Sequence, residues 1–448
     1  MTGTGTFLIL GQTVELIADP FNDSPDATIR HRRRGGVRIH NGRIERVGEA
    51  DALCALDPTV PVTDFGDSLI LPGFVDCHAH YPQTGIIASW GRRLIDWLND
   101  YTFPEEMRFG DPSHSRTVAD RYLDLCLANG TTTACVYCTV HPESVDAFFE
   151  AAAARNLRVA AGKVMMDRNA PDGLCDTVRK GYEQSRALID RWHGRGRALY
   201  AVTPRFAPTS SPEQLAATGA LWAETPGVLL QTHLSEQTEE VAWVRRLFPD
   251  STDYVAVYER HGLTGPGAIM GHAIHLSDRE RRALAETGTG VAHCPTSNTF
   301  IGSGLCDVAG LRRLGISVGL ATDVGGGSSF SMLTTMRTAY EVSQLRGEIL
   351  HPAQLLWLAT EGSADVMGLT GVVGRLAPGA DADLCVLDPT ATPVLAQRTR
   401  RAESIRDLLF ALIMLGDDRA VRAVYVAGQP ALGAVPIGDI DPDSHRVR

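Results

Sequence analysis

At residues 71–80 the sequence reads Leu71-Pro-Gly-Phe-Val-Asp-Cys-His-Ala-His80, and the pattern of the chain changes there. From this point short apolar or β-branched runs alternate with longer helical patterns, which is typical of parallel strands joined by crossover helices. We count eight such runs, which end near His78, Tyr137, Val164, Arg205, His233, His272, Cys294 and Thr322. Eight parallel strands close a (β/α)8 barrel. We therefore predict an α/β fold with a TIM-type barrel over residues 72–373.

Both ends of the chain have the pattern of short strands instead. Asn41-Gly42 lies between two alternating runs at residues 37–47, which strongly indicates a hairpin with a two-residue turn. After Gly374 the strand pattern returns at residues 381–388 and 420–426. Short strands gain stability by pairing. We therefore predict a small composite β-sandwich domain built from residues 1–71 and 374–448.

Composition and charge exclude several classes of protein. The 448 residues are 44% hydrophobic and 21% charged, as in folded globular chains. A net charge of −11 opposes the phosphate contacts of nucleic-acid binding. The apolar run at residues 408–415 is far shorter than the about 20 residues that cross a bilayer. The start of the chain lacks a signal-peptide pattern, and its nine cysteines are scattered, so we expect a cytoplasmic protein without a membrane or nucleic-acid partner.

The pair His78 and His80 is the clearest local sign of chemistry. Residues two apart on a strand point to the same face, so both imidazoles can reach one metal ion. The alternative is that the two histidines are simply polar residues in a turn. Three later predicted strands also end in possible ligands, which are His233, His272 and Asp323. Because the carboxyl ends of barrel strands share one face, we expect these side chains to converge on a metal.

Nitrogen ligands with one carboxylate suit zinc, and iron(II) is a possible alternative. A catalytic zinc ion lowers the pKa of water to about 7. Glu236, three residues after His233, is well placed as a proton shuttle, although a solvated loop glutamate would have the same spacing. His275 and His293 lie close to the strands of the possible ligands and either support the ligands or have purely structural roles.

Several other residues leave alternatives open. Lys163 could be a carbamylated bridge for a second metal. However, it lies on the third predicted strand, and the fourth ends in Arg205, which favours one metal. Cys135 and Cys138 have redox-motif spacing but lie in a strand pattern, which favours core cysteines. Arg205 and Phe206 combine a planar donor with an aromatic face and suit a flat heteroaromatic ring with a carbonyl.

An apolar stripe at helical spacing follows the first histidine pair. It consists of Trp90, Leu94, Trp97, Leu98 and Tyr101. Such a stripe usually faces a core. We therefore expect packing or a subunit contact here rather than direct contact with a substrate.

Six motifs carry a resemblance to a known family. They are Pro72-Gly-Phe-Val-Asp-Cys-His-Ala-His-Tyr-Pro-Gln83, Leu94-Ile-Asp-Trp-Leu-Asn-Asp-Tyr-Thr-Phe-Pro-Glu105, Thr203-Pro-Arg-Phe206, His233-Leu-Ser-Glu236, His293-Cys-Pro-Thr-Ser-Asn298 and Thr322-Asp-Val-Gly-Gly-Gly327. The set resembles the amidohydrolase superfamily, and the tryptophan-containing stretch resembles the guanine deaminases within it. The segment at residues 375–384 resembles the superfamily's strand-forming tail. The resemblance thus covers nearly the whole chain.

The resemblance implies roles for individual residues. The implied ligands of one zinc ion per chain are His78, His80, His233 and Asp323. His272 matches a histidine that contacts either the metal or its water. The implied catalytic groups are Glu236 as proton shuttle, with Asp323 and His272. Gln83 and Arg205 match groups that hydrogen-bond a purine, and Phe206 matches its stacking partner.

The activity that the resemblance implies is hydrolytic deamination of guanine to xanthine and ammonia, by a homodimer. The alternative is a related metal-dependent deaminase of 8-oxoguanine, a pterin or a triazine. A two-metal amide hydrolase and a catalytically inactive scaffold are further alternatives. All implied ligands and Glu236 are present in the sequence, which opposes the inactive scaffold.

Overall fold

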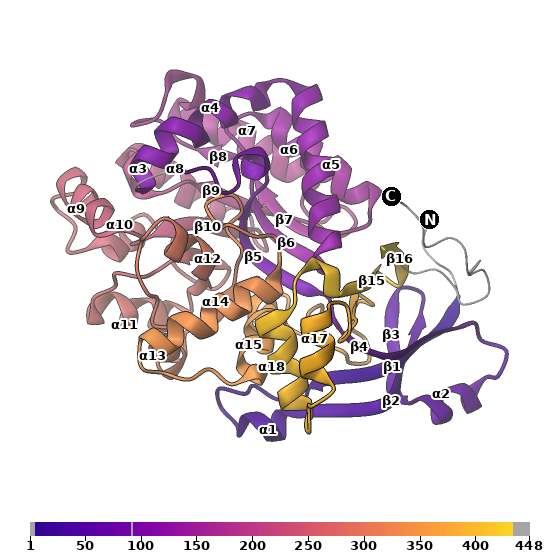
Figure 1. The fold of residues 1–448 in the computed structure, drawn as a ribbon. Helices are drawn as coiled ribbons and strands as arrows, with labels where there is room; N and C mark the ends of the chain where they lie inside the picture. The colour runs from indigo at the N-terminus through magenta and orange to yellow at the C-terminus, as the bar shows by residue number, and fades with distance from the viewer. Residues whose placement is uncertain (1–4, 91–92, 433–448) are drawn as a thin grey trace.

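A ring of parallel strands forms the centre of the molecule. The computed structural model describes residues 5–90 and 93–432 (Figure 1). The strands of the ring are β5 (Phe74–His80), β6 (Thr131–Tyr137), β7 (Arg158–Gly162), β9 (Ala198–Pro204), β10 (Leu229–Leu234), β11 (Ala268–His272), β12 (Gly290–His293) and β13 (Val318–Leu320). They pair in the order β13-β12-β11-β10-β9-β7-β6-β5, and the short β8 (Val164–Met165) pairs with β9. The predicted eight-stranded ring is confirmed.

The ring closes where its first and last strands meet. The amide of His80 donates to the carbonyl of Val324 at 2.7 Å, and the amide of Asp323 donates to the carbonyl of His78 at 3.0 Å. These bonds join the end of β5 to the segment that follows β13. Closure therefore brings the predicted ligands of the first and last strands side by side.

Helices follow the strands and form the outer layer of the barrel (Figure 1). They include α5 (Pro112–Ala128), α6 (Pro142–Ala154), α7 (Val178–Trp192), α8 (Pro212–Ala223), α9 (Thr238–Leu247), α10 (Tyr254–Arg260), α11 (Asp278–Thr287), α12 (Pro295–Phe300), α13 (Val308–Arg313), α14 (Met332–Leu345), α15 (Pro352–Leu358) and α16 (Glu361–Val366). Proline at the first helical position and a side-chain cap before it explain two of the starts. The side chain of Asp111 accepts from the amide of Ser113 before α5, and Ser211 accepts from Gln214 before α8.

The two ends of the chain build one seven-stranded sheet beside the barrel. Its strands are β1 (Thr6–Leu16), β2 (Ile29–His40), β3 (Arg43–Glu49), β4 (Val62–Pro72), β14 (Leu384–Leu387), β15 (Val421–Val426) and β16 (Gln429–Leu432), with α1 (Pro25–Thr28) and α2 (Ala50–Leu56) between strands. They are paired in the order β16-β15-β14-β4-β1-β2-β3. The predicted joint β unit is confirmed, with the N-terminal and C-terminal parts meeting at the antiparallel pair β14–β4.

The predicted hairpin lies between β2 and β3. His40 pairs with Arg43, and Asn41 and Gly42 have φ values of 50° and 78°. Positive φ at both central residues is the feature of the type I′ turn that Asn-Gly favours. Strand β1 is continuous, with a register shift in its pairing to β2 after Gly11.

Helices α17 (Pro393–Thr399) and α18 (Ile405–Leu415) interrupt the strands of the C-terminal segment. They lie beside α14 and α15 (Figure 1), and Leu409 and Leu412 of α18 share an apolar cluster with Met336 of α14. The division at residues 71/72 and 373/374 stays a prediction, and residues 1–4 and 433–448 of its outer parts lie outside the described residues.

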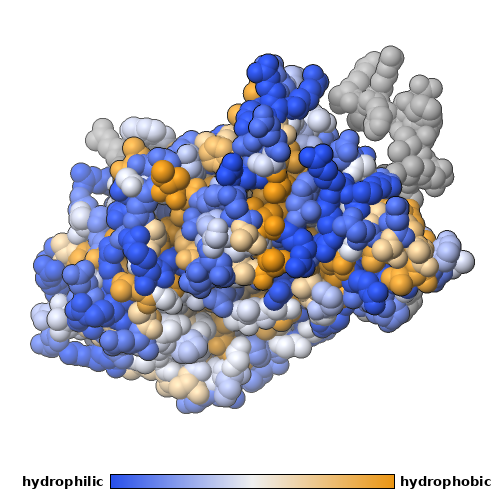
Figure 2. All heavy atoms as spheres, turned by 90° about the horizontal axis from the view of Figure 1, so that it is seen from below, coloured by the Kyte–Doolittle hydropathy of each residue, from blue (hydrophilic) through white to orange (hydrophobic). Residues whose placement is uncertain are grey.

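One face of the molecule shows hydrophobic and hydrophilic side chains intermixed (Figure 2). In the described part of the chain, every helix is too short or too polar to span a membrane.

Substitution of Gly42 tests the contact between the two ends of the chain. A Cβ at Gly42 would lie 2.9 Å from the carbonyl oxygen of Ala427, in the turn between β15 and β16. A Cβ at Gly66, which also has positive φ, meets nothing within 4 Å. Gly42→Ala should therefore lower the free energy of unfolding by about 1–3 kcal/mol more than Gly66→Ala. Denaturant titration measures both free energies, and equal losses would contradict the close approach of Gly42 and Ala427.

Candidate metal centre

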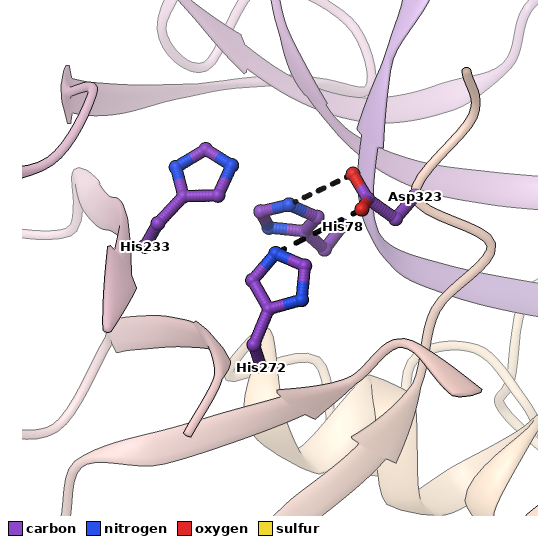
Figure 3. Close-up of side chains that lie close together, drawn as sticks. All are labelled: His78, His233, His272 and Asp323. Atoms are coloured by element: carbon purple, nitrogen blue, oxygen red, sulfur yellow. Dashed lines mark ion pairs between the residues drawn. The ribbon is translucent and has the colours of Figure 1, made fainter. Parts of the chain in front are cut away.

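Five ionisable side chains meet at the carboxyl ends of the barrel strands. His78 and His80 come from β5, His233 from β10, His272 from the last position of β11, and Asp323 follows β13. All five are buried or nearly so. Figure 3 shows four of them pointing toward one another.

The distances within this group are short. Oδ1 of Asp323 is 3.3 Å from Nε2 of His78 and 3.3 Å from Nε2 of His80. Nε2 of His80 is 3.2 Å from Nε2 of His233. The donor atoms of His78, His233, His272 and Asp323 all lie within 4.8 Å of one another. The structure thus brings together all the residues that the sequence singled out as ligands.

His272 lies between two carboxylates. Its Nε2 is 3.8 Å from Oδ2 of Asp323 and 3.6 Å from Oε2 of Glu236. Burial alone would lower the pKa of His272, but the charges of Glu236 and Asp323 outweigh it and raise that pKa. The position allows contact with a cation or with a water molecule beside it.

The donor set fits a divalent cation. Burial lowers the pKa values of His78 and His233, and that of His80 to about 3, so these imidazoles are neutral and can donate lone pairs. Both ring nitrogens of His78 and Nδ1 of His80 are buried without a hydrogen-bond partner in the described part of the chain. Buried polar atoms are normally paired. The imidazoles of His78 and His80 beside it, together with the charge of His272, hold the pKa of Asp323 well below its usual value despite burial, so it offers a carboxylate.

Neighbouring oxygens orient two of the imidazoles. Nδ1 of His233 lies 2.7 Å from the carbonyl oxygen of Arg205, and Nδ1 of His272 lies 2.8 Å from Oδ1 of Asn298. Since a carbonyl or amide oxygen only accepts, each Nδ1 carries the proton and each Nε2 is free to face the centre. Asn298 ends one of the motifs, but nothing in the sequence indicated this role.

Tyr137, the last residue of β6, packs against three of the histidines. Its ring centroid is 4.4 Å from that of His80, 4.8 Å from His233 and 4.9 Å from His78. The ring fixes the imidazoles from one side. Sequence reasoning missed this residue because an aromatic side chain at a strand end looks like ordinary core.

Glu236 follows β10 and is buried beside His272. Oε1 of Glu236 accepts from Oγ of Ser303 at 2.8 Å, and the Glu236 amide donates to Glu240 at 2.8 Å. Burial raises the pKa of Glu236. A raised pKa favours the uptake of a proton by this carboxylate, as a proton shuttle requires. Ser303, which fixes this carboxylate, was not found from the sequence.

A pocket opens beside these groups. It is lined by His80, Gln83, Leu94, Trp97, Leu98, Arg205, Phe206, His233, Glu236, His272, Ile301, Asp323 and Gly326, and encloses about 400 Å³, including the part open to solvent. The predicted apolar stripe forms α3 (Leu94–Trp97) and a π-helical turn at Leu98–Thr102. Its buried members Leu94, Trp97 and Leu98 pack in an apolar cluster, as expected, and they also line the pocket. Trp90 is 74% exposed and lies off the buried stripe.

The polar wall of the pocket contains Gln83 and Arg205. Gln83 lies in the turn η1 (Tyr81–Ile86), and Arg205 follows β9. Nη1 of Arg205 donates to both carboxylate oxygens of Glu106 at 2.9 Å, and Nε2 of Gln83 donates to the same carboxylate at 3.1 Å. Phe206 supplies an aromatic face, with its ring centroid 6.4 Å from that of His233. A flat polar ring would meet donors at its edge and an aromatic face.

Comparison with known proteins places the fold and these residues in a family. The model of the amidohydrolase family matches residues 69–431. The chain belongs to the amidohydrolase family. It is 44% identical to the guanine deaminase of Escherichia coli (strain K12) over 95% of this chain and 96% of that protein.

Solved structures of the amidohydrolase fold agree with this assignment. The E. coli guanine deaminase structure superimposes with a TM-score of 0.93 over 95% of this chain and 99% of that one. A C. acetobutylicum guanine deaminase with guanine bound in its active site has 27% identity and a TM-score of 0.85, over 95% and 99% of the two chains.

The other residues singled out from the sequence of this amidohydrolase have separate roles. Lys163 is buried in an ion pair with Asp176. Cys135 donates to Gln231 at 3.2 Å, and all cysteines in the described residues are free thiols. Nε2 of His275 lies 2.8 Å from the carbonyl oxygen of Ser303, and His293 is fully buried, which lowers its pKa to about 3.

Substitution of Gly271 tests how tightly the histidines are placed. A Cβ at Gly271 would lie 2.7 Å from Cε1 of His78, whose ring is buried and cannot move freely. Because metal–ligand distances tolerate only about 0.2 Å, Gly271→Ala should weaken metal affinity by about 10- to 100-fold. Competition with a chromophoric chelator measures this affinity.

Gly290→Ala is the matched control on the neighbouring strand. The added Cβ would meet Val366 at 3.1 Å instead of a histidine. We expect its metal affinity to remain that of the unmodified protein, and an equal loss in both variants would contradict the specific role of the Gly271 position.

Proposed function

We propose that this chain is a zinc-dependent aminohydrolase that converts guanine and water to xanthine and ammonia. The observation that carries the proposal is the meeting of the histidine–aspartate group, the buried Glu236 and the donor wall of Arg205 and Gln83 in one pocket. The identity with the E. coli guanine deaminase, over nearly the whole length of both chains, supports guanine as the substrate.

In this proposal His78, His80, His233 and Asp323 hold one ion, and His272 contacts the ion or the water beside it. Three imidazole nitrogens and one carboxylate oxygen suit zinc, with iron(II) as the alternative. When bound, zinc supplies a Lewis acid that brings the pKa of water near neutrality. The pairing of Lys163 with Asp176 supports a single ion, because this lysine is engaged elsewhere.

The chain's own groups bind the ring and move the protons. Arg205 and Gln83 donate to polar atoms at the edge of the ring, and Phe206 stacks on its face. Asp323 and His272 take the proton of the water that attacks C2. Glu236, protonated at the start, gives its proton to N3. It then carries the proton of the new C2 hydroxyl to the departing amine, so that ammonia leaves and xanthine remains, and the proton held by Asp323 and His272 returns to Glu236.

The family likeness also supports a homodimer. Cytoplasmic location and the domain boundaries at residues 71/72 and 373/374 stay predictions from the sequence.

Substitution of Glu236 tests the proton shuttle. Glu236→Gln keeps the shape of the side chain but cannot carry the proton, so kcat for guanine should fall by about 100- to 10,000-fold. Elemental analysis should find the zinc content unchanged. Glu239→Gln removes a carboxylate three residues along, which is 57% exposed and pairs with Arg93, and should leave kcat unchanged. Full turnover in Glu236→Gln would refute the shuttle role.

A panel of ring substrates tests the proposed substrate. Ammonia release should be fastest, by kcat/KM, with guanine among guanine, 8-oxoguanine, a pterin and a triazine. The four compounds differ in ring fusion and substituents, and the 44% identity to the E. coli guanine deaminase favours guanine. A higher kcat/KM for another ring would replace guanine in the proposal.

A further inference from the structure

Glu106 lies behind the two polar side chains of the pocket wall. It is the last residue of α4 (Phe103–Glu106) and is 1% exposed. Its carboxylate accepts two bonds from Nη1 of Arg205 and one from Nε2 of Gln83. One buried carboxylate therefore ties together side chains from two distant segments, and a buried charge of this kind requires such partners.

The partners of Gln83 fix the direction of its amide. A carboxylate only accepts hydrogen bonds, so the amide nitrogen must face Glu106. The backbone amide of Gly325 only donates, and it lies 3.3 Å from Oε1 of Gln83. The second lone pair of Oε1 and the second hydrogen on Nε2 remain for a ligand, because Gln83 lines the pocket. Gln83 thus presents an acceptor and a donor side by side.

Arg205 is charged but electrically compensated. Within residues 5–90 and 93–432, Glu106 is the one side chain that accepts from its guanidinium, and it does so through Nη1 alone. Nε and Nη2 are therefore available to a ligand in the pocket that Arg205 lines. Because Glu106 cancels the charge of Arg205, the wall offers hydrogen bonds without a net positive field.

We propose that Glu106 is the positioning residue that sets the charge specificity of this pocket. It holds Arg205 and Gln83 as one donor–acceptor edge and makes that edge favour a neutral purine lactam over an anionic purine. The inference rests on the proposed function and deepens it. Xanthine loses a ring proton more readily than guanine and then becomes an anion. An uncompensated guanidinium would attract this anion, so the pairing of Arg205 with Glu106 weakens retention of the product.

Substitution of Glu106 tests both parts. In Glu106→Gln one amide oxygen must replace a carboxylate that accepts three hydrogen bonds, so KM for guanine should rise by about 10- to 100-fold while kcat changes less. The same variant leaves Arg205 uncompensated. At one neutral pH, inhibition by urate, which is anionic, should therefore improve relative to hypoxanthine, which is neutral, by about tenfold compared with the unmodified enzyme.

Glu105→Gln is the matched control. This neighbouring carboxylate contacts Arg108 and His114, outside the pocket wall. It should leave KM and the urate-to-hypoxanthine inhibition ratio unchanged.

Glu106→Asp keeps the charge but withdraws it by one methylene, and it tests positioning even if Glu106→Gln does not fold. It should raise KM for guanine and keep the inhibition ratio of the unmodified enzyme. An unchanged KM and ratio in Glu106→Gln, or in Glu106→Asp a KM equal to that of the unmodified enzyme, would overturn the inference. An unmodified enzyme that releases no ammonia from guanine would overturn the proposed function instead. The role of Glu106 would then be tested by calorimetry, from the affinities of the unmodified protein and of Glu106→Gln for hypoxanthine and urate.

Discussion

The contact between Asp323 and the imidazoles of His78 and His80 is the interaction on which the rest of the structure depends. It lies at the seam where β5, the first strand of the barrel, meets the segment after β13, the last one. Backbone bonds close the same seam, and below it Asp76 accepts from the amide of Thr322 at 3.1 Å. The closure of the barrel and the geometry of the candidate metal centre therefore depend on each other, because the same few residues form the seam and supply the side chains of the centre.

This arrangement costs free energy of folding. Several ionisable groups are buried together, and His272 and Asp323 have left-handed backbone, with φ values of 70° and 49°. Such conformations cost about 1–3 kcal/mol each outside glycine and concentrate at functional sites. A bound cation would offset part of this cost, because it satisfies the buried nitrogens and the carboxylate at once. Such a cation would contribute to folding as well as to chemistry.

The sequence predicted the barrel and the convergence of the candidate ligands, because both follow from local patterns in the chain. Strand periodicity marks where a strand ends, and in a parallel barrel that position alone assigns His233, His272 and Asp323 to a common face. Asn41-Gly42 was equally decisive, since few turns accept positive φ at two successive residues.

Other features could not be predicted from local patterns. Helix α18 has an apolar run that fits a buried helix or a strand equally well, and only its packing against α14 decides between them. Glu106, Tyr137 and Ser303 act through contacts with residues far away in the chain, and no spacing rule connects them to the histidines. Leu94 and Trp97 have the spacing of core residues and do pack in an apolar cluster, but the spacing could not show that this cluster also lines the pocket.

The most direct test of the central claim, that one cation joins the converging side chains, is a crystal structure with anomalous scattering measured at the zinc edge. The account predicts a single strong peak per chain, at about 2.0–2.2 Å from a nitrogen of His78, His80 and His233 and from an oxygen of Asp323. A map without a peak between these side chains, or with two, would contradict it.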